Sequence, residues 1–155
     1  KIHTFTGPGT FTVNCGGNPL GSTSVDYLVV AGGASGGSGG GGAQGAGGGA
    51  GGYRESSGGA SGCYSRTPLG ACVAAVSVSA QDYPVTVGAG GASVSGQNTG
   101  NNGSPSTALS ITSTGGGSRN PGGGAGGGAS GPAPDNSNGG AGGKGVVIIR
   151  YKYQN

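Results

Sequence analysis

The chain has 155 residues, of which 44 are glycine and 8 are proline, and its formal net charge at pH 7 is only +3. Charged residues make up 7% of the chain and form no Lys/Arg cluster, which argues against a nucleic-acid-binding surface. We find no signal peptide and no apolar run long enough to span a bilayer, so membrane insertion is not expected. Methionine is absent, even at position 1, which indicates a processed chain or a fragment.

Short segments typical of β-strands alternate with glycine-rich tracts along the chain. Strands are expected near 2–13 (around a Gly-Pro-Gly turn), 25–31, 71–89, 106–114 and 145–153. These segments are rich in Val, Ile, Thr, Tyr and Phe, which fit a half-buried pleated surface. No segment shows helical periodicity, and each glycine would destabilise a helix by about 1 kcal/mol relative to alanine. The sequence therefore predicts one all-β sandwich domain over 1–155 with glycine-rich connections.

Four glycine-rich tracts, near 31–52, 88–96, 114–131 and 138–145, separate these strands. In the longest tract, glycine recurs at every third position from Gly33 to Gly51. Three residues per turn is the period of the polyproline II helix, which has no internal hydrogen bonds. Because glycine lets backbones approach closely enough to bond to one another, we expect a bundle of glycine helices rather than a linker. The longest tract would span about 68 Å, so it must fold back or the domain must be elongated.

The order of the strands and tracts resembles the glycine-rich domain of bacteriophage tail-fibre and related virion proteins. The segments that carry the resemblance are HTFTGPGTFTV, VDYLVVAGG, GGAGGYR, YPVTVGAGG, NNGSPSTALSITSTGGG and GGKGVVIIRYKY, and they cover nearly the whole chain. The VVAGG pattern with its glycine tract is also similar to the extracellular glycine-rich region of the anaplastic lymphoma kinase receptor. The resemblance implies a jelly-roll-like β-sandwich with an inserted polyglycine II helix bundle, whose exposed turns bind bacterial surface receptors. The insert SSGGASGCYSRTPLGACVAAVSVSA departs from this pattern.

Two of the three cysteines, Cys63 and Cys72, lie in that insert and bracket the loop YSRTPLGA. We expect a disulfide between them, because the core is thin and the resemblance points outside the cell; the alternative is two reduced thiols in a cytosolic protein. Closing this loop would stabilise the fold by about 2 to 3 kcal/mol. Cys15 is left over as a buried free thiol, which we favour, or as an intermolecular bridge. No metal site is expected, since the spacing is unsuitable and only His3 could assist.

Candidate receptor contacts are the polar and aromatic residues that interrupt the glycine tracts. They are Tyr53 and Arg54 (followed by Glu55) at the end of the first tract, Tyr64 and Arg66 in the cysteine loop, Arg119 and Asn120 in one turn, and Asp135 and Asn136 in another. Such side chains on rigid turns suit the recognition of carbohydrate or protein. The alternative for each of them is a solvated loop tip that keeps the surface soluble.

Catalysis is not expected, because the one histidine and four scattered acids form no pair for acid–base chemistry and no nucleophile has a base partner. No cofactor is expected either. The resemblance implies an extracellular, virion-associated fibre or spike domain that binds a host cell-surface glycan or protein. It also implies contacts with other virion or filament subunits, in a homo-oligomer such as a trimer. The alternatives are a purely structural decoration or filament subunit and an ice-binding protein with flat glycine-helix faces.

Overall fold

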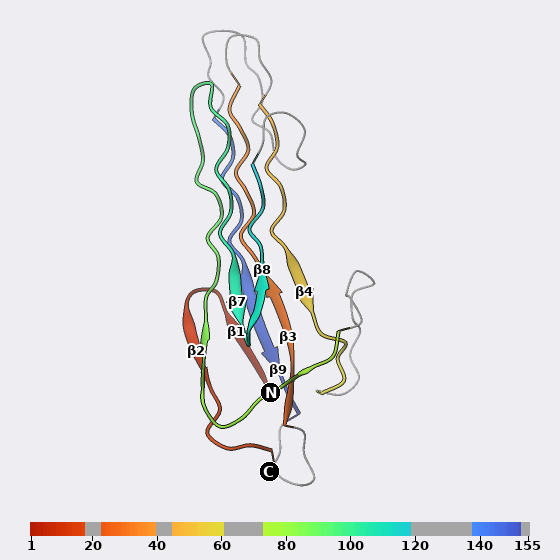
Figure 1. Cartoon of the computed structure of the whole chain (residues 1–155). Helices are drawn as coiled ribbons and strands as arrows, with labels where there is room; N and C mark the ends of the chain where they lie inside the picture. Colours follow the sequence, from red (N-terminus) through yellow and green to blue (C-terminus); the bar gives the residue numbers. More distant parts are fainter. Residues whose placement is uncertain (18–22, 40–44, 61–72, 119–137, 153–155) are drawn as a thin grey trace.

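The computed structural model describes residues 1–17, 23–39, 45–60, 73–118 and 138–152. Within these ranges the fold is all-β, with no helix and several antiparallel sheets, which confirms the predicted class. The described part is elongated (Figure 1). Strands occupy one end, where the N-terminus lies, and long extended segments with few side chains run side by side to the other end.

The larger sheet has five strands and is antiparallel throughout. Its main path runs β1 (Ile2–Phe5), β9 (Val146–Arg150), β3 (Ser24–Val30) and β4 (Tyr53–Glu55), and β5 (Val76–Ser77) pairs with the start of β3. The first and last strands of the chain are therefore neighbours, with Ile2 opposite Arg150. Long-range pairing of this kind requires the two ends of the described chain to meet.

The remaining described strands form two antiparallel pairs. One pair is β2 (Gly9–Thr12) with β6 (Asp82–Val85), and the other is β7 (Ser106–Ala108) with β8 (Ile111–Ser113). Thr86 and Thr107 form a bridge between them, and each N–H donates to the carbonyl of the other residue with an N to O distance of 2.9 Å. The two pairs are thereby joined into a continuous surface next to the larger sheet.

The apolar core lies between the larger sheet and the two smaller pairs. In β9 the side chains of Val147 and Ile149 are fully buried, while their neighbours in sequence are half-buried, as expected for alternation along a strand. Nine buried residues from both sides form one cluster: Phe11, Val25, Tyr27, Val29, Val85, Ala108, Leu109, Val147 and Ile149. Removal of this apolar cluster from water stabilises the strand end of the molecule.

Several strands differ from the sequence expectation. The segment expected as one strand over 106–114 forms the β7–β8 hairpin, because Leu109 and Ser110 adopt positive φ angles of 53° and 62° and reverse the chain. Within the segment 71–89, the described strands are only β5 and β6. Tyr53, Arg54 and Glu55, expected as part of a loop, form β4, because their backbone pairs with Leu28 to Val30.

Candidate functional site

Residues 31–38 run through the middle of the glycine-rich end, and every one of their N–H groups donates a hydrogen bond. The partner segment changes with a period of three. Residues 31, 34 and 37 donate to carbonyls of the segment 45–52, residues 32, 35 and 38 to the segment 97–104, and residues 33 and 36 to the segment 138–145. The N to O distances lie between 2.7 and 3.0 Å. The central segment therefore faces three different neighbours in turn.

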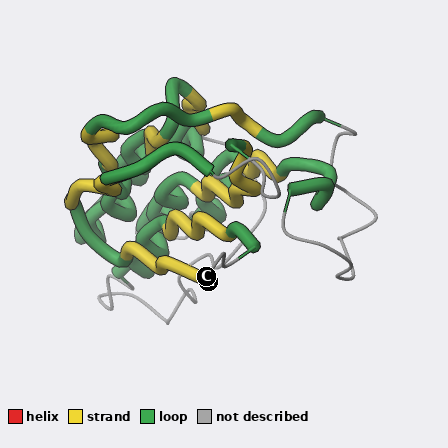
Figure 2. Tube along the Cα trace, turned by 90° about the horizontal axis from the view of Figure 1, so that it is seen from below, coloured by secondary structure: helices red, strands yellow, loops and turns green. Residues whose placement is uncertain are grey.

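Two further segments donate to the carbonyls of the central segment. The N–H of Gly91 donates to Gly33 O and the N–H of Gly116 donates to Gly32 O, each at 2.9 Å. We call the segments 31–38, 45–52, 88–104, 114–117 and 138–145 together the glycine array. An end-on view shows these loop segments clustered beside one another (Figure 2). Hydrogen bonds between neighbouring backbones hold this array together where side chains are nearly absent.

Glycines recur at every third position in several segments of the array, where neighbouring backbones are in van der Waals contact. A Cβ atom added to Gly142 would lie 2.0 Å from Gly33 O, and one added to Gly139 would lie 2.0 Å from Gly36 O. The same contact recurs three residues apart in two other segments, at Gly48 and Gly51 and at Gly100 and Gly103, with distances of 2.0 to 2.3 Å. Since a Cβ atom cannot approach an oxygen this closely, any larger residue would force these backbones apart.

The few side chains inside the array are small, and their hydroxyl groups have partners. Ser35 is fully buried, and its Oγ accepts a hydrogen bond of 2.7 Å from the Asn101 N–H. The Ser38 Oγ donates to the Gly96 carbonyl. These contacts fix the hairpin 88–104 to the central segment, since buried polar groups are costly unless they are bonded.

A polar turn closes that hairpin at the end of the array. Gly96 has a φ of +70°, which favours glycine, and the Asn98 side-chain amide donates to Ser95 O at 2.6 Å. Val94 forms a bridge with Gly139, so the turn is also tied to the segment 138–145. Ser95, Gln97 and Asn98 are exposed. The turn therefore presents two amides and a hydroxyl group on a hydrogen-bonded support.

The sequence-based prediction places the end of the second glycine tract at residue 96 and no tract over 97–104, so it does not include this turn. The pattern that identifies it is the pair Gly100 and Gly103, spaced by three like the glycines of the longest tract. Ser-Gly between two such segments is typical of a tight turn.

Among the predicted contact residues, Tyr53 and Arg54 lie on β4, which is an edge of the larger sheet. Both are exposed, and the Tyr53 hydroxyl donates to Glu55 Oε2 at 2.8 Å. They therefore flank the junction between sheet and array, away from the described turn (Figure 1). The other predicted contacts, Tyr64, Arg66, Arg119, Asn120, Asp135 and Asn136, and the predicted pair Cys63 and Cys72 lie outside the described residues.

Asp26 is a buried acid, with 1% of its surface exposed, on the face of β3 opposite the alternating core residues. It accepts hydrogen bonds from the Ser56 hydroxyl at 2.7 Å, the Gly58 N–H at 3.1 Å and the Ala60 N–H at 3.0 Å. Charge-assisted bonds of this kind are the stronger ones in proteins. They hold residues 56–60, which lead into the predicted cysteine loop, against the larger sheet.

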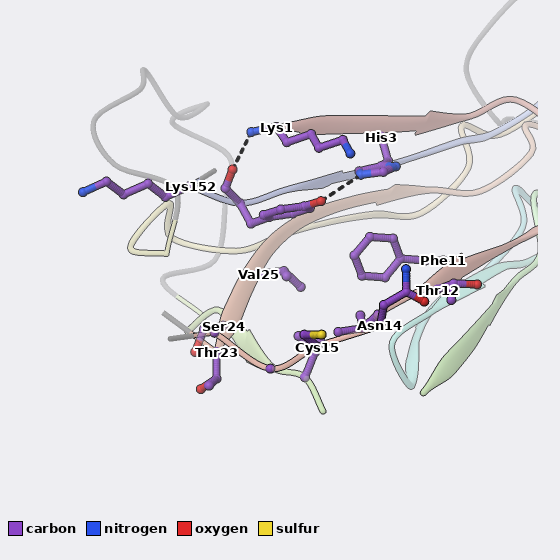
Figure 3. Close-up of a pocket in the computed structure, with 15 residues that line it drawn as sticks. Lys1, His3, Phe11, Thr12, Asn14, Cys15, Thr23, Ser24, Val25 and Lys152 are labelled. Carbon is purple, nitrogen blue, oxygen red and sulfur yellow. Dashed lines mark hydrogen bonds between the residues drawn. The ribbon is translucent and has the colours of Figure 1, made fainter. Parts of the chain in front are cut away.

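The prediction that Cys15 is buried is wrong, because its thiol is free and exposed. β2 ends at Thr12, and the Val13 N–H still donates a hydrogen bond to Gln81 O at 3.0 Å. Cys15 follows this contact and therefore lies outside the core. It lines a pocket at the strand end of the molecule together with His3 (Figure 3). The pKa of His3 is lowered by burial and further by the positive charges of the Lys1 side chain and the chain's amino group.

The described residues include no group of three or more His, Cys, Asp or Glu side chains that could hold a metal ion. Nor does that part of the chain contain a helix long and apolar enough to cross a membrane.

The profile of a glycine-rich domain family matches residues 5–121, well over half of the chain, so the protein belongs to this family. No curated protein sequence matches it.

Proposed function

We propose that this glycine-rich domain is a non-enzymatic, virion-associated part of a phage fibre or spike that uses turns of the glycine array to contact a host cell-surface glycan or protein. On this proposal the domain acts outside the cell. The array is a bundle of polyglycine II helices, and the strands form a jelly-roll-like sandwich. The observation that carries the proposal is the hydrogen-bond ladder of residues 31–38, which supports a polar turn at the far end of an elongated molecule.

The period of three in that ladder favours polyglycine II helices. A chain with three residues per turn directs successive N–H groups toward three neighbours, and residues 31 to 38 donate in that order. Close packing further requires glycine wherever a neighbour's carbonyl approaches, and pairs such as Gly139 and Gly142 meet this requirement. Side-chain packing could not make such a bundle, because glycine and alanine have almost no side chain to bury.

The polar turn favours recognition over a purely mechanical role. Gln97 and Asn98 are exposed, and amide groups can both donate to and accept from sugar hydroxyls or peptide groups. The backbone beneath them is fixed by the Ser38 hydroxyl and by Gly96, so little conformational entropy is lost on binding. A rigid scaffold that presents polar turns is a common solution for binding sites.

Electron microscopy of the native particle that carries this chain, with mass spectrometry of its components, tests the proposal. We expect a few copies at the end of a fibre. The double variant Gln97→Ala, Asn98→Ala should then reduce adsorption of the particle to its host cells, while Thr112→Ala, an exposed change on β8, should not. Equal adsorption by both variants would contradict the role of this turn.

A structural subunit is a second candidate, favoured by the exposed edges of the larger sheet. Among the described strands, β1 pairs only with β9 and β4 pairs only with β3. Ile2 on β1 is 62% exposed, which is unusual for a large apolar side chain on an edge strand. Strand pairing between copies would cover this edge. Many copies in a regular lattice or filament, rather than a few at a fibre end, would favour this candidate.

A further inference from the structure

An open pocket of about 340 Å³ lies at the strand end, beside the first and last described strands (Figure 3). It is independent of the polar turn, which lies at the far end of the glycine array. Apolar groups supply much of its lining: Phe11, Val13, Val25, Val78 and Tyr151. Pockets of this size are at the lower end of the range for small-molecule sites, so a molecule of one or two rings would fit.

Aromatic rings form one wall of the pocket. The rings of His3 and Tyr151 are nearly parallel, with centroids 5.7 Å apart and planes 17° apart, and the rings of His3 and Phe11 are nearly perpendicular, with centroids 5.3 Å apart. The Tyr151 hydroxyl is also within 3.2 Å of His3 Nε2. The two rings are therefore joined at the Tyr151 hydroxyl, and because Tyr151 lines the pocket, a flat ring can pack against it.

The lysine side chains that line the pocket are both positively charged. Lys1 and Lys152 belong to the lining, and none of the described residues that line it is an Asp or Glu. The Lys1 side chain extends toward His3, whereas Lys152 is directed away from the pocket floor and toward its outer side (Figure 3). Asp82 accepts a hydrogen bond from the Thr12 hydroxyl at 2.6 Å and lowers the local positive charge without lining the pocket.

Neutral polar groups complete the rim. Asn14, Thr23 and Ser24 line the pocket and offer an amide and two hydroxyl groups. Such groups can bond to the oxygens of an acid but cannot replace its charge. The pocket therefore combines an apolar, ring-bearing wall with cationic and neutral donors.

We propose that this pocket binds a small organic acid whose flat, apolar ring packs against Tyr151 and Phe11. The carboxylate of this acid lies near the side-chain ammonium group of Lys1. Lys152 adds to the positive potential at the mouth. A cation is disfavoured, because the described lining offers no carboxylate to pair with it.

Titration of the ¹⁵N-labelled protein with 1-naphthoate, followed by NMR, tests the proposal, with uncharged 1-naphthalenemethanol as the matched ligand. We expect saturable shifts of the amides of Asn14, Cys15 and Val25, and binding of the alcohol that is about threefold to fivefold weaker. Lys1→Gln should weaken naphthoate binding by a similar factor and leave the alcohol unaffected. Lys144→Gln removes the same charge at an exposed position in the glycine array and should change neither.

Alkylation of Cys15 by iodoacetamide gives an independent readout, since this thiol lines the pocket. Mass spectrometry of the peptide that contains Cys15 should show slower alkylation at saturating naphthoate. Equal affinity for acid and alcohol would overturn the proposal, as would shifts confined to other parts of the molecule. Titration without saturation, or an unchanged rate of Cys15 alkylation, would also overturn it.

Discussion

The two ends of this molecule are held together by different physical means. At the strand end, side chains such as Val29, Val147 and Ile149 are fully buried, and removal of apolar surface from water stabilises the fold. In the glycine array, the buried residues are glycine, alanine and serine, and hydrogen bonds between backbones connect five segments. The strand end should therefore be sensitive to the loss of atoms, and the array to their addition.

The largest effect is expected from Ile149→Ala, which leaves a cavity between the sheets. The free energy of unfolding should fall by about 2–5 kcal/mol, and Ile149→Val should lower it by only about 0.5–1.5 kcal/mol. Urea unfolding followed by circular dichroism measures both. A loss from Ile149→Ala no larger than that from Ile149→Val would contradict a side-chain core at this position.

The converse test adds one methyl group to the array. Gly142→Ala should destabilise the fold by about 3 kcal/mol, because the new Cβ would lie 2.0 Å from Gly33 O. Its neighbour Gly143 is a matched control, since a Cβ there meets nothing within 4 Å, and Gly143→Ala should change stability by about 0.5 kcal/mol or less. Similar urea midpoints for the two variants would contradict the claim that close approach of backbones makes the array sensitive to added atoms.

Ser106 lies where the strand end meets the glycine array, and its hydroxyl group connects the two regions. Its fully buried hydroxyl donates to Val30 O at 2.8 Å and accepts from the Gly88 N–H at 2.8 Å. Ser106→Ala leaves both backbone groups without this partner and should cost about 1–3 kcal/mol. The exposed Ser93 is the control, and Ser93→Ala should change the unfolding free energy by about 0.5 kcal/mol or less.

The smallest effect is a gain in stability at the β7–β8 turn. Ser110 is exposed and has a φ of 62°, so Ser110→Gly should relieve strain and stabilise the fold by about 0.5–1 kcal/mol. Leu109→Gly relieves similar strain but removes a buried side chain, so it should destabilise. Thermal unfolding of both variants distinguishes these outcomes. A loss of stability in Ser110→Gly would show that the turn is not strained.

Glycine has two different roles in this molecule, in turns and in close approach between backbones. Among the described glycines, only Gly58 and Gly96 have positive φ angles. Apart from Gly96 in its turn, the glycines of the array, such as Gly103 and Gly142, are therefore needed for close approach and not for an unusual backbone conformation. The turn at Leu109 and Ser110 shows the reverse, with positive φ angles and no glycine.

The all-β class could be predicted from the sequence, because strand-forming residues alternate with glycine tracts. The every-third series from Gly33 to Gly51 includes Gly48 and Gly51, which do meet the central segment closely. The series does not identify Gly32, where a Cβ would lie 2.0 Å from Ala89 O, since that requirement comes from a neighbour distant in sequence. Periodicity within one tract cannot show which other segments surround it.

The candidate sites were harder to predict. Tyr53 and Arg54 end a glycine tract, and nothing local shows that they pair with β3 as an edge strand. Cys15 was expected to be buried because free cysteine usually is, but its exposure depends on where β2 ends. The pocket beside it combines residues from the two ends of the described chain, such as His3 and Tyr151. Only the tertiary fold brings these residues together.

Amide hydrogen exchange of the native protein, resolved residue by residue by NMR, tests most directly whether the glycine array is a folded, hydrogen-bonded structure. We expect the amides from Gly32 to Ser38 to be protected to nearly the same free energy as the core amides of Val29 and Ile149. The N–H groups of residues 32 to 38 all donate to backbone carbonyls, so each should exchange only after the array opens. Exchange of these amides at the rate of an unstructured chain, with the core amides still protected, would contradict the account.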